Sequence, residues 1–329
     1  MKKVFKILAI LSLLVLFACG KQENETKVNS QEKTIETKIV EQKKTPIKEV
    51  VYDLTTKKED IGTTVIVEKG ETLYVLEKEK ISVPYDFEIG KYEVTNKEFV
   101  EFLNNYKVSK DGTYKGKPMY GIDSKHSQIG YDGKKFFIKP WKDNKGRDID
   151  LSDYPVMLVY WYGAVAYCNW LSEKSGLDKV YDETTWINLK DEEVVKKKGY
   201  RLPTRNEWIY AMQGGSKSTG AKFAGSNNLD EVAWHEDTSM TDGNSALSTR
   251  EKDGITRGTM PVGLLKSNEL GIFDMLGSVW EWTNTDSYGG KMTLGICWSN
   301  SEIAGIWGYI FLDDTRFNHG FRILKTKGE

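Results

Sequence analysis

The C-terminal part of the chain, from about residue 216 to residue 322, carries no helical periodicity. It is rich in Gly, Asn, Asp, Ser and Trp, and its apolar runs are short. Gly and Asn weaken long helices and long strands, so such a segment orders itself by packing loops and short strands around large aromatic side chains. The ten Trp and seventeen Tyr of the chain can supply that core. We therefore predict an α+β fold with short strands, few helices and much irregular structure.

Three helices are predicted upstream of this segment. Thr95 and Glu98 have the spacing of a capping box, in which each side chain hydrogen-bonds the backbone N–H of the other residue, and Thr204 and Glu207 repeat it. The third helix begins near residue 161, because apolar residues recur there at helical spacing as far as a glycine at position 176.

Two other segments are less regular. Short β-like runs occupy residues 63–95, and Gly70 and Glu71 are predicted as a hairpin turn between two of them. Residues 107–150 contain many Gly, Tyr, Lys and Asp. They look like an insertion, and their composition indicates no role.

The charge and the cysteine content exclude several kinds of partner and site. A net charge of −1 gives no field that would hold nucleic acid or an anionic membrane surface, so nucleic acid is excluded as a partner. Beyond the N-terminal region, Cys168 and Cys297 are too few for a disulfide framework, and neither has a metal-ligand spacing. A disulfide between them and two unpaired thiols both stay open as alternatives.

The N-terminus has the pattern of an export signal. Three lysines precede an apolar run over residues 7–16, which is too short to span a bilayer, and the next residues end L-F-A-C at Cys19. This ending resembles the lipobox of bacterial lipoproteins, in which the Cys is acylated, for example with palmitate. The alternative is an ordinary signal peptide with an incidental Cys. The resemblance implies a protein anchored by lipid in the bacterial cell envelope. A ligand-binding function would further imply the exposed surface of the outer membrane.

Five blocks of sequence, taken in order, resemble the formylglycine-generating-enzyme (sulfatase-modifying factor) family, whose fold is a variant of the C-type lectin fold. They are "IGKYEVTNKEFVEFLN" (89–104), "YPVMLVYWYGAVAYCNWLS" (154–172), "YRLPTRNEWIYAMQGG" (200–215), "PVGLLKSNELGIFDMLGSVWEWTN" (261–284) and "HGFRI" (319–323). The resemblance implies a C-type lectin-like fold of this type over most of the chain.

The domain organisation follows from the export signal, the composition and this resemblance. Residues 20–48 contain almost no large apolar side chains, which is typical of a flexible stalk. The expected segments are 1–18 as a lipoprotein signal peptide, 19–50 as lipidated Cys and stalk, 51–81 as a short β-rich segment, and 82–326 as the C-type lectin-like domain with a variable C-terminal segment 296–319.

The fourth block implies a calcium site. In calcium-binding relatives it supplies oxygen ligands, and the matching positions are Asp274, Glu281 and the carbonyls of Gly277 and Val279. In the alternative, the two carboxylates only hydrogen-bond the turn. No cofactor is expected to be required, and calcium is the one structural candidate.

The oxidase chemistry of the family requires two cysteines in the C-terminal block. The resemblance places them at positions 300 and 305, which are Asn300 and Gly305 here. We therefore expect no enzymatic activity, with a formylglycine-generating oxidase as the alternative. Iron-dependent sulfoxide synthases, a second enzymatic relative, need a His-rich motif, and the three His of this chain are not closely spaced.

The final segment is similar to the variable proteins of diversity-generating retroelements, treponemal variable lipoproteins among them. There, copying errors at adenine turn chosen Asn codons into NNY codons, which cannot encode Lys, Glu, Gln, Met or Trp. Between residues 296 and 319 only Trp298, Glu302 and Trp307 fall outside the NNY set. The stretch "DDTRFNHGFR" (313–322) reads as a template in which Thr315, Phe317 and His319 replaced Asn.

A non-catalytic, surface-displayed ligand-binding lipoprotein is therefore the predicted function, with a static envelope-structural lipoprotein as another alternative. The ligand is expected to be a protein or other surface molecule, and the membrane is contacted through the lipid. The expected variable, ligand-binding positions are Ile296, Ser299, Asn300, Ile303, Ala304, Ile306, Gly308, Tyr309, Phe311, Leu312, Thr315, Phe317 and His319.

Side-chain exposure provides a test of these positions. Exposure is expected for Ile296, Ser299, Tyr309, Phe311, Thr315, Phe317 and His319, whereas Trp298 and Trp307 are expected in the core. In the alternative, the apolar residues Ile303, Ile306, Trp307, Ile310 and Leu312 are ordinary core.

Overall fold

The computed structural model describes residues 63–142, 146–239, 258–300, 306–312, 314 and 318–327. The expected lipidation site Cys19 and the expected stalk lie outside these residues. The described chain combines short strands, a few short helices and long irregular connections, which confirms the predicted α+β class. Within this part of the chain, no helix is both long and apolar enough to cross a membrane.

The helices begin where the sequence predicts. Both capping boxes are present, since Thr95 Oγ1 accepts from Glu98 N and Thr204 Oγ1 accepts from Glu207 N while each glutamate binds the cap N–H in return. The helices are α2 (Asn96–Asn105), α3 (Trp161–Lys174), α4 (Asp191–Val194) and α5 (Arg205–Met212), with 3-10 turns η1 (Gly215–Lys217) and η2 (Leu229–Glu231).

A four-stranded sheet with the order β15-β14-β13-β16 forms the centre of the domain. Its strands β14 and β15 run antiparallel to their neighbours, and β16 pairs with β13 in parallel. Trp282 and Ile310 pack in one core cluster and Leu294 in another, so both faces of the sheet are buried along most of its length. The strands are β13 (Trp280–Ser287), β14 (Gly290–Leu294), β15 (Trp307–Ile310) and β16 (His319–Gly320).

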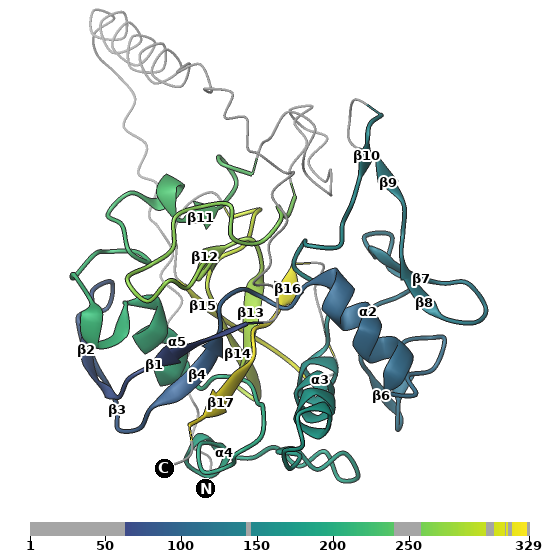
Figure 1. Ribbon diagram of the computed structural model, residues 1–329, viewed down its shortest axis with the longest axis horizontal. Coiled ribbons are helices and arrows are strands. Elements are labelled where there is room, and N and C mark those ends of the chain that lie inside the picture. Colours follow the sequence, from purple (N-terminus) through teal and green to yellow (C-terminus); the bar gives the residue numbers. More distant parts are fainter. Residues whose placement is uncertain are drawn as a thin grey trace, which may run out of the picture. The chain divides into compact units, whose positions relative to one another are not determined.

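The first and last described strands share a second sheet. The order β1-β4-β17 places β1 (Thr64–Val67) and β17 (Leu324–Thr326) on either side of β4 (Phe87–Gly90), as Figure 1 shows. The hairpin of β2 (Gly70–Tyr74) and β3 (Glu79–Val83) turns after residue 74, so the turn predicted at Gly70 and Glu71 is wrong. Gly70 instead begins β2, where a Cβ would lie 2.7 Å from the Tyr210 hydroxyl oxygen, so the glycine leaves room for that side chain.

The insertion 107–150 is a set of small hairpins beside α2 (Figure 1). Asn104 of α2 exchanges two hydrogen bonds with the backbone of Phe136, at 2.8 and 3.0 Å. The hairpins are β5 (Thr113–Tyr114) with β6 (Lys117–Pro118), β7 (Ile129–Tyr131) with β8 (Phe136–Ile138), and β9 (Trp141–Lys142) with β10 (Asp148–Ile149).

Outside the insertion, a short parallel pair joins β11 (Ala233–Trp234) to β12 (Leu276–Gly277).

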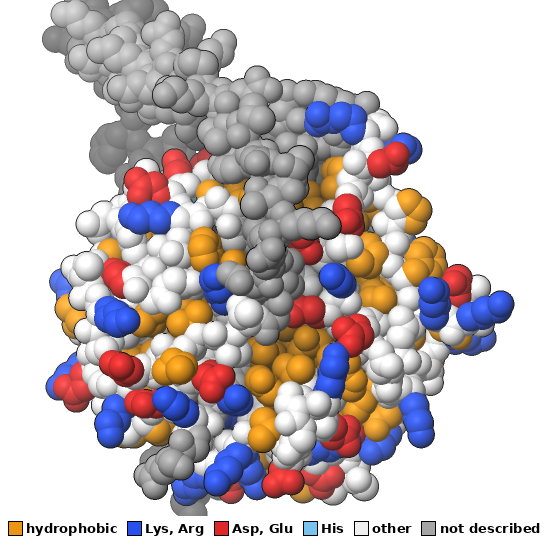
Figure 2. Space-filling view, in the orientation of Figure 1, with side chains coloured by type: hydrophobic (Ala, Val, Ile, Leu, Met, Phe, Trp, Pro, Cys, Tyr) orange, Lys and Arg blue, Asp and Glu red, His pale blue; other side chains and the backbone are white. Residues whose placement is uncertain are grey.

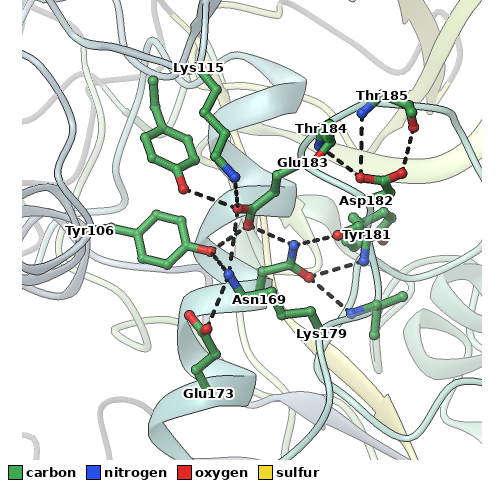
Figure 3. Close-up of polar contacts among 12 residues, drawn as sticks. Tyr106, Lys115, Asn169, Glu173, Lys179, Tyr181, Asp182, Glu183, Thr184 and Thr185 are labelled. Atoms are coloured by element: carbon green, nitrogen blue, oxygen red, sulfur yellow. Dashed lines mark hydrogen bonds and ion pairs between the residues drawn. The ribbon is translucent and has the colours of Figure 1, made fainter.

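A buried carboxylate ties the insertion to α3. Glu183, whose side chain is 3% exposed, accepts hydrogen bonds from the Tyr106 hydroxyl, from Asn169 Nδ2 at 2.8 Å and from the Tyr114 hydroxyl at 3.2 Å (Figure 3). The ammonium groups of Lys115 and Lys179 each lie 3.6 Å from the same carboxylate. Burial and the Glu183 carboxylate raise the pKa of Tyr106, so its phenol remains a donor. The first hairpin is therefore held in place by a charged and fully bonded group.

Charges of both signs are interspersed on the surface. Figure 2 shows Lys and Arg beside Asp and Glu over the visible face, with apolar side chains between them. No field of a single sign covers this face.

Candidate ligand-binding surface

Four aromatic side chains form an exposed row at the outer end of the central sheet. Tyr288 lies in the turn between β13 and β14, and Trp307, Tyr309 and Phe311 alternate along β15 and just beyond it. Their exposed fractions are 74%, 42%, 46% and 58%. Seven large apolar side chains are exposed among the described residues, and four of them belong to this aromatic row. A concentration of this kind is typical of a contact surface rather than of scattered surface residues.

The rings of the aromatic row contact one another. Tyr288 stacks on Trp307 with ring centroids 6.4 Å apart and planes 15° apart, and it meets Tyr309 at 5.2 Å. Phe311 meets Tyr309 edge-on at 6.4 Å. Because each ring restrains its neighbours, the row offers a partner large contact area at little cost in conformational entropy.

Two glycines create the turn that carries the row. Gly289 has φ +82°, which favours glycine, and a Cβ on Gly290 would lie 2.3 Å from the carbonyl oxygen of Ile310. Any side chain at position 290 would push β15 away from the turn. Sequence reasoning missed Tyr288, although the consecutive glycines after it are a hairpin signal that could have placed it at a strand tip.

Lys291 supports the turn from inside. Its side chain is fully buried, its Nζ donates to the Asn284 carbonyl and lies 3.0 Å from Asp286 Oδ1, and it sits 4.9 Å from the centre of the Trp161 ring. The register between β13 and β14 shifts between Trp282 and Asp286, and the Lys291 ammonium group bonds the backbone of that stretch at Asn284. Burial lowers the pKa of Lys291 to about 8.

This lowered pKa predicts a pH dependence of stability. Between pH 8 and the ordinary lysine value the folded chain loses the Lys291 proton while the unfolded chain keeps it, so stability from this group rises with pH. We expect the wild type to gain about 2 kcal/mol relative to Lys291→Met between about pH 7 and about pH 9.5. Urea denaturation at both pH values measures the difference. A difference that does not change with pH would contradict the lowered pKa.

The predicted exposure is wrong at two positions. Ile296 and His319 are buried, at 0% and 3% exposed, and Ile306, an expected variable position, is buried as its alternative held. Ile296 and Ile306 pack in the cluster that includes Trp208 of α5. His319 pairs with Trp280 in β16, and its ring lies 5.5 Å from that of Trp282. These three side chains do not reach a ligand in this conformation.

Trp298 and Trp307 differ in exposure. Trp298 is buried as predicted, but Trp307 is exposed, because it shares with Tyr309 the exposed face of β15, whereas Ile310 of the same strand is buried. Tyr309 and Phe311 are exposed, as predicted. The remaining expected positions divide between half-buried residues, which are Ser299, Asn300, Gly308 and Leu312, and residues outside the described chain, which are Ile303, Ala304, Thr315 and Phe317.

Asn300 has a structural task. Its Oδ1 accepts from Cys297 N at 2.8 Å, and its carbonyl accepts from Glu236 N at 2.9 Å. Leu312 packs against the core cluster that includes Ile310. Of the predicted surface, Tyr309 and Phe311 are therefore the side chains that the described structure leaves available for contact.

The expected calcium ligands are arranged around an arginine. Glu281, which is 1% exposed, accepts from Arg322 Nε at 2.8 and 3.0 Å, from its Nη2 at 2.7 Å and from Trp208 Nε1 at 2.8 Å. Arg322 also donates to the carbonyl oxygens of Gly90 and Asp274. The guanidinium thus neutralises the Glu281 carboxylate, whose oxygens are taken up by protein donors and, as arranged, are not open to a calcium ion.

Two close contacts also shape the turn that contains the expected ligands. Asp274 Oδ2 accepts from Gly263 N at 2.5 Å, and a Cβ on Gly277 would lie 2.4 Å from Trp234 N. No group of three His, Cys, Asp or Glu side chains that could hold a metal occurs in the ranges the structure describes. The hydrogen-bonding alternative for Asp274 and Glu281 therefore matches the geometry.

Chelation provides a direct test of this arrangement. We expect EDTA, and calcium added back, to leave the thermal unfolding midpoint unchanged, because Arg322 already neutralises Glu281. Differential scanning calorimetry measures the midpoint. A fall with EDTA that calcium reverses would show that a metal replaces part of the arginine network.

The two cysteines lie apart in the core. Cys168 and Cys297 are free, buried and in different core clusters. Burial raises the pKa of both thiols, which disfavours the thiolate.

The fold places the chain in a defined class. The model of the sulfatase-modifying factor enzyme 1-like domain matches residues 50–325, so the chain belongs to this family. The fold is confirmed by CarF, with a TM-score of 0.55, 22% identity and coverage of 81% of this chain and 98% of that one. Treponema denticola variable protein 1 has a TM-score of 0.52, 19% identity and coverage of 82% and 99%.

The relatives in sequence are diverse. The chain is 34% identical to the Chaperone protein LppX of Paenibacillus barcinonensis over 213 residues, 60% of this chain and 61% of that protein. It is 26% identical to the bovine Formylglycine-generating enzyme over 211 residues, 60% and 48% of the two chains. It is also 26% identical to the bovine Inactive C-alpha-formylglycine-generating enzyme 2 over 212 residues, 60% and 59%. The chain thus matches less than two thirds of each of these relatives, and the family contains members named as inactive.

Proposed function

We propose that the protein is a non-catalytic ligand-binding lipoprotein whose C-terminal segment is diversified by a retroelement. The observation that carries the proposal is the aromatic row, in which four rings in contact are exposed on a sheet whose other side chains are mostly buried. Recognition then rests on shape and aromatic contact, and the ligand is a protein or other surface molecule.

The aromatic row divides into a fixed and a replaceable part. Trp307 cannot arise from an NNY codon, and Tyr288 precedes the variable segment, so the stacked pair of Tyr288 and Trp307 is constant under the proposal. Tyr309 and Phe311 belong to the NNY set and lie next to this pair. A constant aromatic platform would supply affinity, while the two neighbouring positions would select the ligand.

The absence of catalysis in this proposal is supported by the C-terminal block. The enzyme family requires thiols at positions 300 and 305, and Asn300 uses its side chain to bond the turn at Cys297. Gly305 lies outside the described residues and has no side chain. An oxidase assay on a substrate cysteine peptide with copper tests the alternative, and activity that is lost in Cys297→Ser would refute the non-catalytic assignment.

The DNA downstream of the gene tests the diversification. The proposal requires a near-copy of the final coding segment that differs almost only where the copy has adenine, together with a reverse transcriptase gene nearby. Absence of both would leave a static envelope lipoprotein of the same fold as the better account.

The anchor is tested separately. We propose acylation at Cys19 on the basis of the lipobox pattern, and display at the outer-membrane surface because the proposed ligand is a protein or other surface molecule. Metabolic labelling with an alkyne fatty acid should mark the wild type and leave Cys19→Ser unmarked. Equal labelling of both would exclude this anchor.

A further inference from the structure

The turn that carries Tyr288 has a conformation that tyrosine does not favour. Ser287 pairs with Gly290, so Tyr288 and Gly289 form a two-residue hairpin loop, and both have positive φ, at +46° and +82°. Positive φ at both positions is typical of a type I′ turn, whose first position favours Asn, Asp or Gly. A tyrosine in the left-handed region is strained, and it persists only where surrounding contacts hold it. Because the strained residue is exposed, the strain points to a function of its side chain.

The other rings of the aromatic row supply part of the restraint on this turn. Tyr288 stacks on Trp307 and also meets Tyr309, but all three rings are exposed. Contacts at the surface bury little area and open easily, so they hold a strained backbone less firmly than contacts in the core do. The remaining restraint has to come from the inner side of the hairpin.

The stretch of β13 just before the turn is fixed by side chains from other elements. Asp191 of α4 accepts from Asn284 Nδ2 at 2.9 Å and from Thr285 Oγ1 at 2.5 Å. Asn188, in the loop before α4, donates to Asp286 Oδ1 at 2.5 Å. These hydrogen bonds hold three successive residues at the place where the β13–β14 register is irregular.

Lys291 joins the same stretch to β14, directly below the turn. It lies opposite Asp286 in the strand register, its Nζ is 3.0 Å from Asp286 Oδ1, and it donates to the Asn284 carbonyl. The Lys291 side chain is fully buried whereas that of Asp286 is 63% exposed, so the ion pair runs from the core to the surface beside the turn. A buried ammonium group is stabilised only by partners of this kind, and in holding them it fixes both strands where the turn begins.

The charges around Lys291 come from two elements. Burial lowers the pKa of Lys291 to about 8, against the opposing effects of Asp286 of β13 and Asp191 of α4. The Trp161 ring at the start of α3 lies 4.9 Å from the ammonium, and β15 contains no charged residue. The charged residues of α5 pair with other side chains, Arg205 with Glu79 and Glu207 with Arg201. Near pH 8 the ammonium therefore loses its proton, and its ion pair with Asp286 is lost with it.

We propose that Lys291 is a positioning residue for the aromatic row: its positive charge fixes the end of β13 and thereby keeps Tyr288 stacked on Trp307. Loss of the charge loosens the turn, so the geometry of the row changes with pH. That the row binds a ligand rests on the proposed function, but the arrangement of its rings can be measured without one.

Fluorine NMR of the full-length protein labelled with 5-fluorotryptophan tests this role, with Trp307→Phe identifying the Trp307 resonance. The pH is varied from about 6.5 to about 9.5, a range in which an ordinary lysine stays largely charged. We expect the Trp307 resonance to move in one step with a midpoint at about pH 8, because the ring current of Tyr288 changes as the stack loosens.

Three variants separate positioning from a general effect of pH. In Lys291→Met the Trp307 resonance should stay at one position over the whole range. Asp286→Asn changes only the exposed partner, and at neutral pH its Trp307 resonance should be displaced toward the position that the wild type reaches at high pH. The matched control is Asp148→Asn, which breaks another cross-strand ion pair, with Lys142 at 2.6 Å, and should leave the titration unchanged.

The proposal is overturned if the Trp307 resonance does not titrate in the wild type, if it titrates equally in Lys291→Met, or if Asp148→Asn changes it as much as Asp286→Asn does. If Lys291→Met does not fold, the comparison of the two aspartate variants decides. None of these outcomes bears on whether the row binds a ligand. Conversely, a C-terminal segment that is identical in all isolates would contradict the proposed diversification and leave the expected titration of Trp307 as it is.

Discussion

Replacing Arg322 by methionine is expected to lower the free energy of unfolding by about 3 to 5 kcal/mol, because it leaves a buried, unpaired carboxylate at Glu281. The arginine also satisfies carbonyl oxygens from two distant segments, at Gly90 and at Phe273. Urea denaturation at pH 7 measures the loss.

Two controls separate this cost from a general effect of removing an arginine. Arg205 bonds Glu77 and Glu79 at a partly exposed position, so Arg205→Met should cost about 1 kcal/mol or less. In the double variant Arg322→Met/Glu281→Gln the uncompensated charge is gone, and part of the stability should return. Equal losses in Arg322→Met and Arg205→Met would show that the buried pair does not organise the fold.

Asparagine substitutions should affect the C-terminal segment in two opposite ways. At Tyr309 and Phe311 the side chains are exposed, so the change in stability is expected to stay below about 1 kcal/mol. At Ile296 and Ile306 the same change places an amide in the core and should cost about 4 kcal/mol or more.

Thermal unfolding of the four single variants measures this contrast. If Tyr309→Asn or Phe311→Asn unfolds as readily as Ile296→Asn, these side chains support the fold and cannot be freely replaceable. If Ile296→Asn is tolerated, the packing of this segment has been assigned wrongly.

The sequence predicted those features that depend on neighbouring residues. Thr95 and Thr204 begin helices because a capping box is complete within four positions, and the structure has both. The family blocks likewise identified the fold, since the match covers residues 50–325. The turn expected at Gly70 is wrong, because Gly70 pairs with Val83 within the hairpin and the chain turns between Tyr74 and Glu79.

Exposure within the C-terminal segment could not be predicted, because it depends on strand pairing. Trp307 is exposed since the pairing of β15 with β14 turns its side chain to the open face and that of Ile310 to the core, and His319 is buried since β16 pairs with β13. Tyr288 completes the aromatic row although it comes from a different strand connection, and only the pairing of β14 with β15 brings it there. The local pattern of apolar and polar residues does not show which strands pair, and so it does not show which side chains are exposed.

The central claim is that this segment is a replaceable recognition surface, and sequencing its coding region in many isolates tests it most directly. We predict frequent substitutions at Tyr309 and Phe311, drawn from the residues that NNY codons encode, on a constant background of Tyr288, Trp298 and Trp307. An identical segment in every isolate, or substitutions as frequent at the buried Ile296 and Ile306 as at the exposed pair, would contradict the claim.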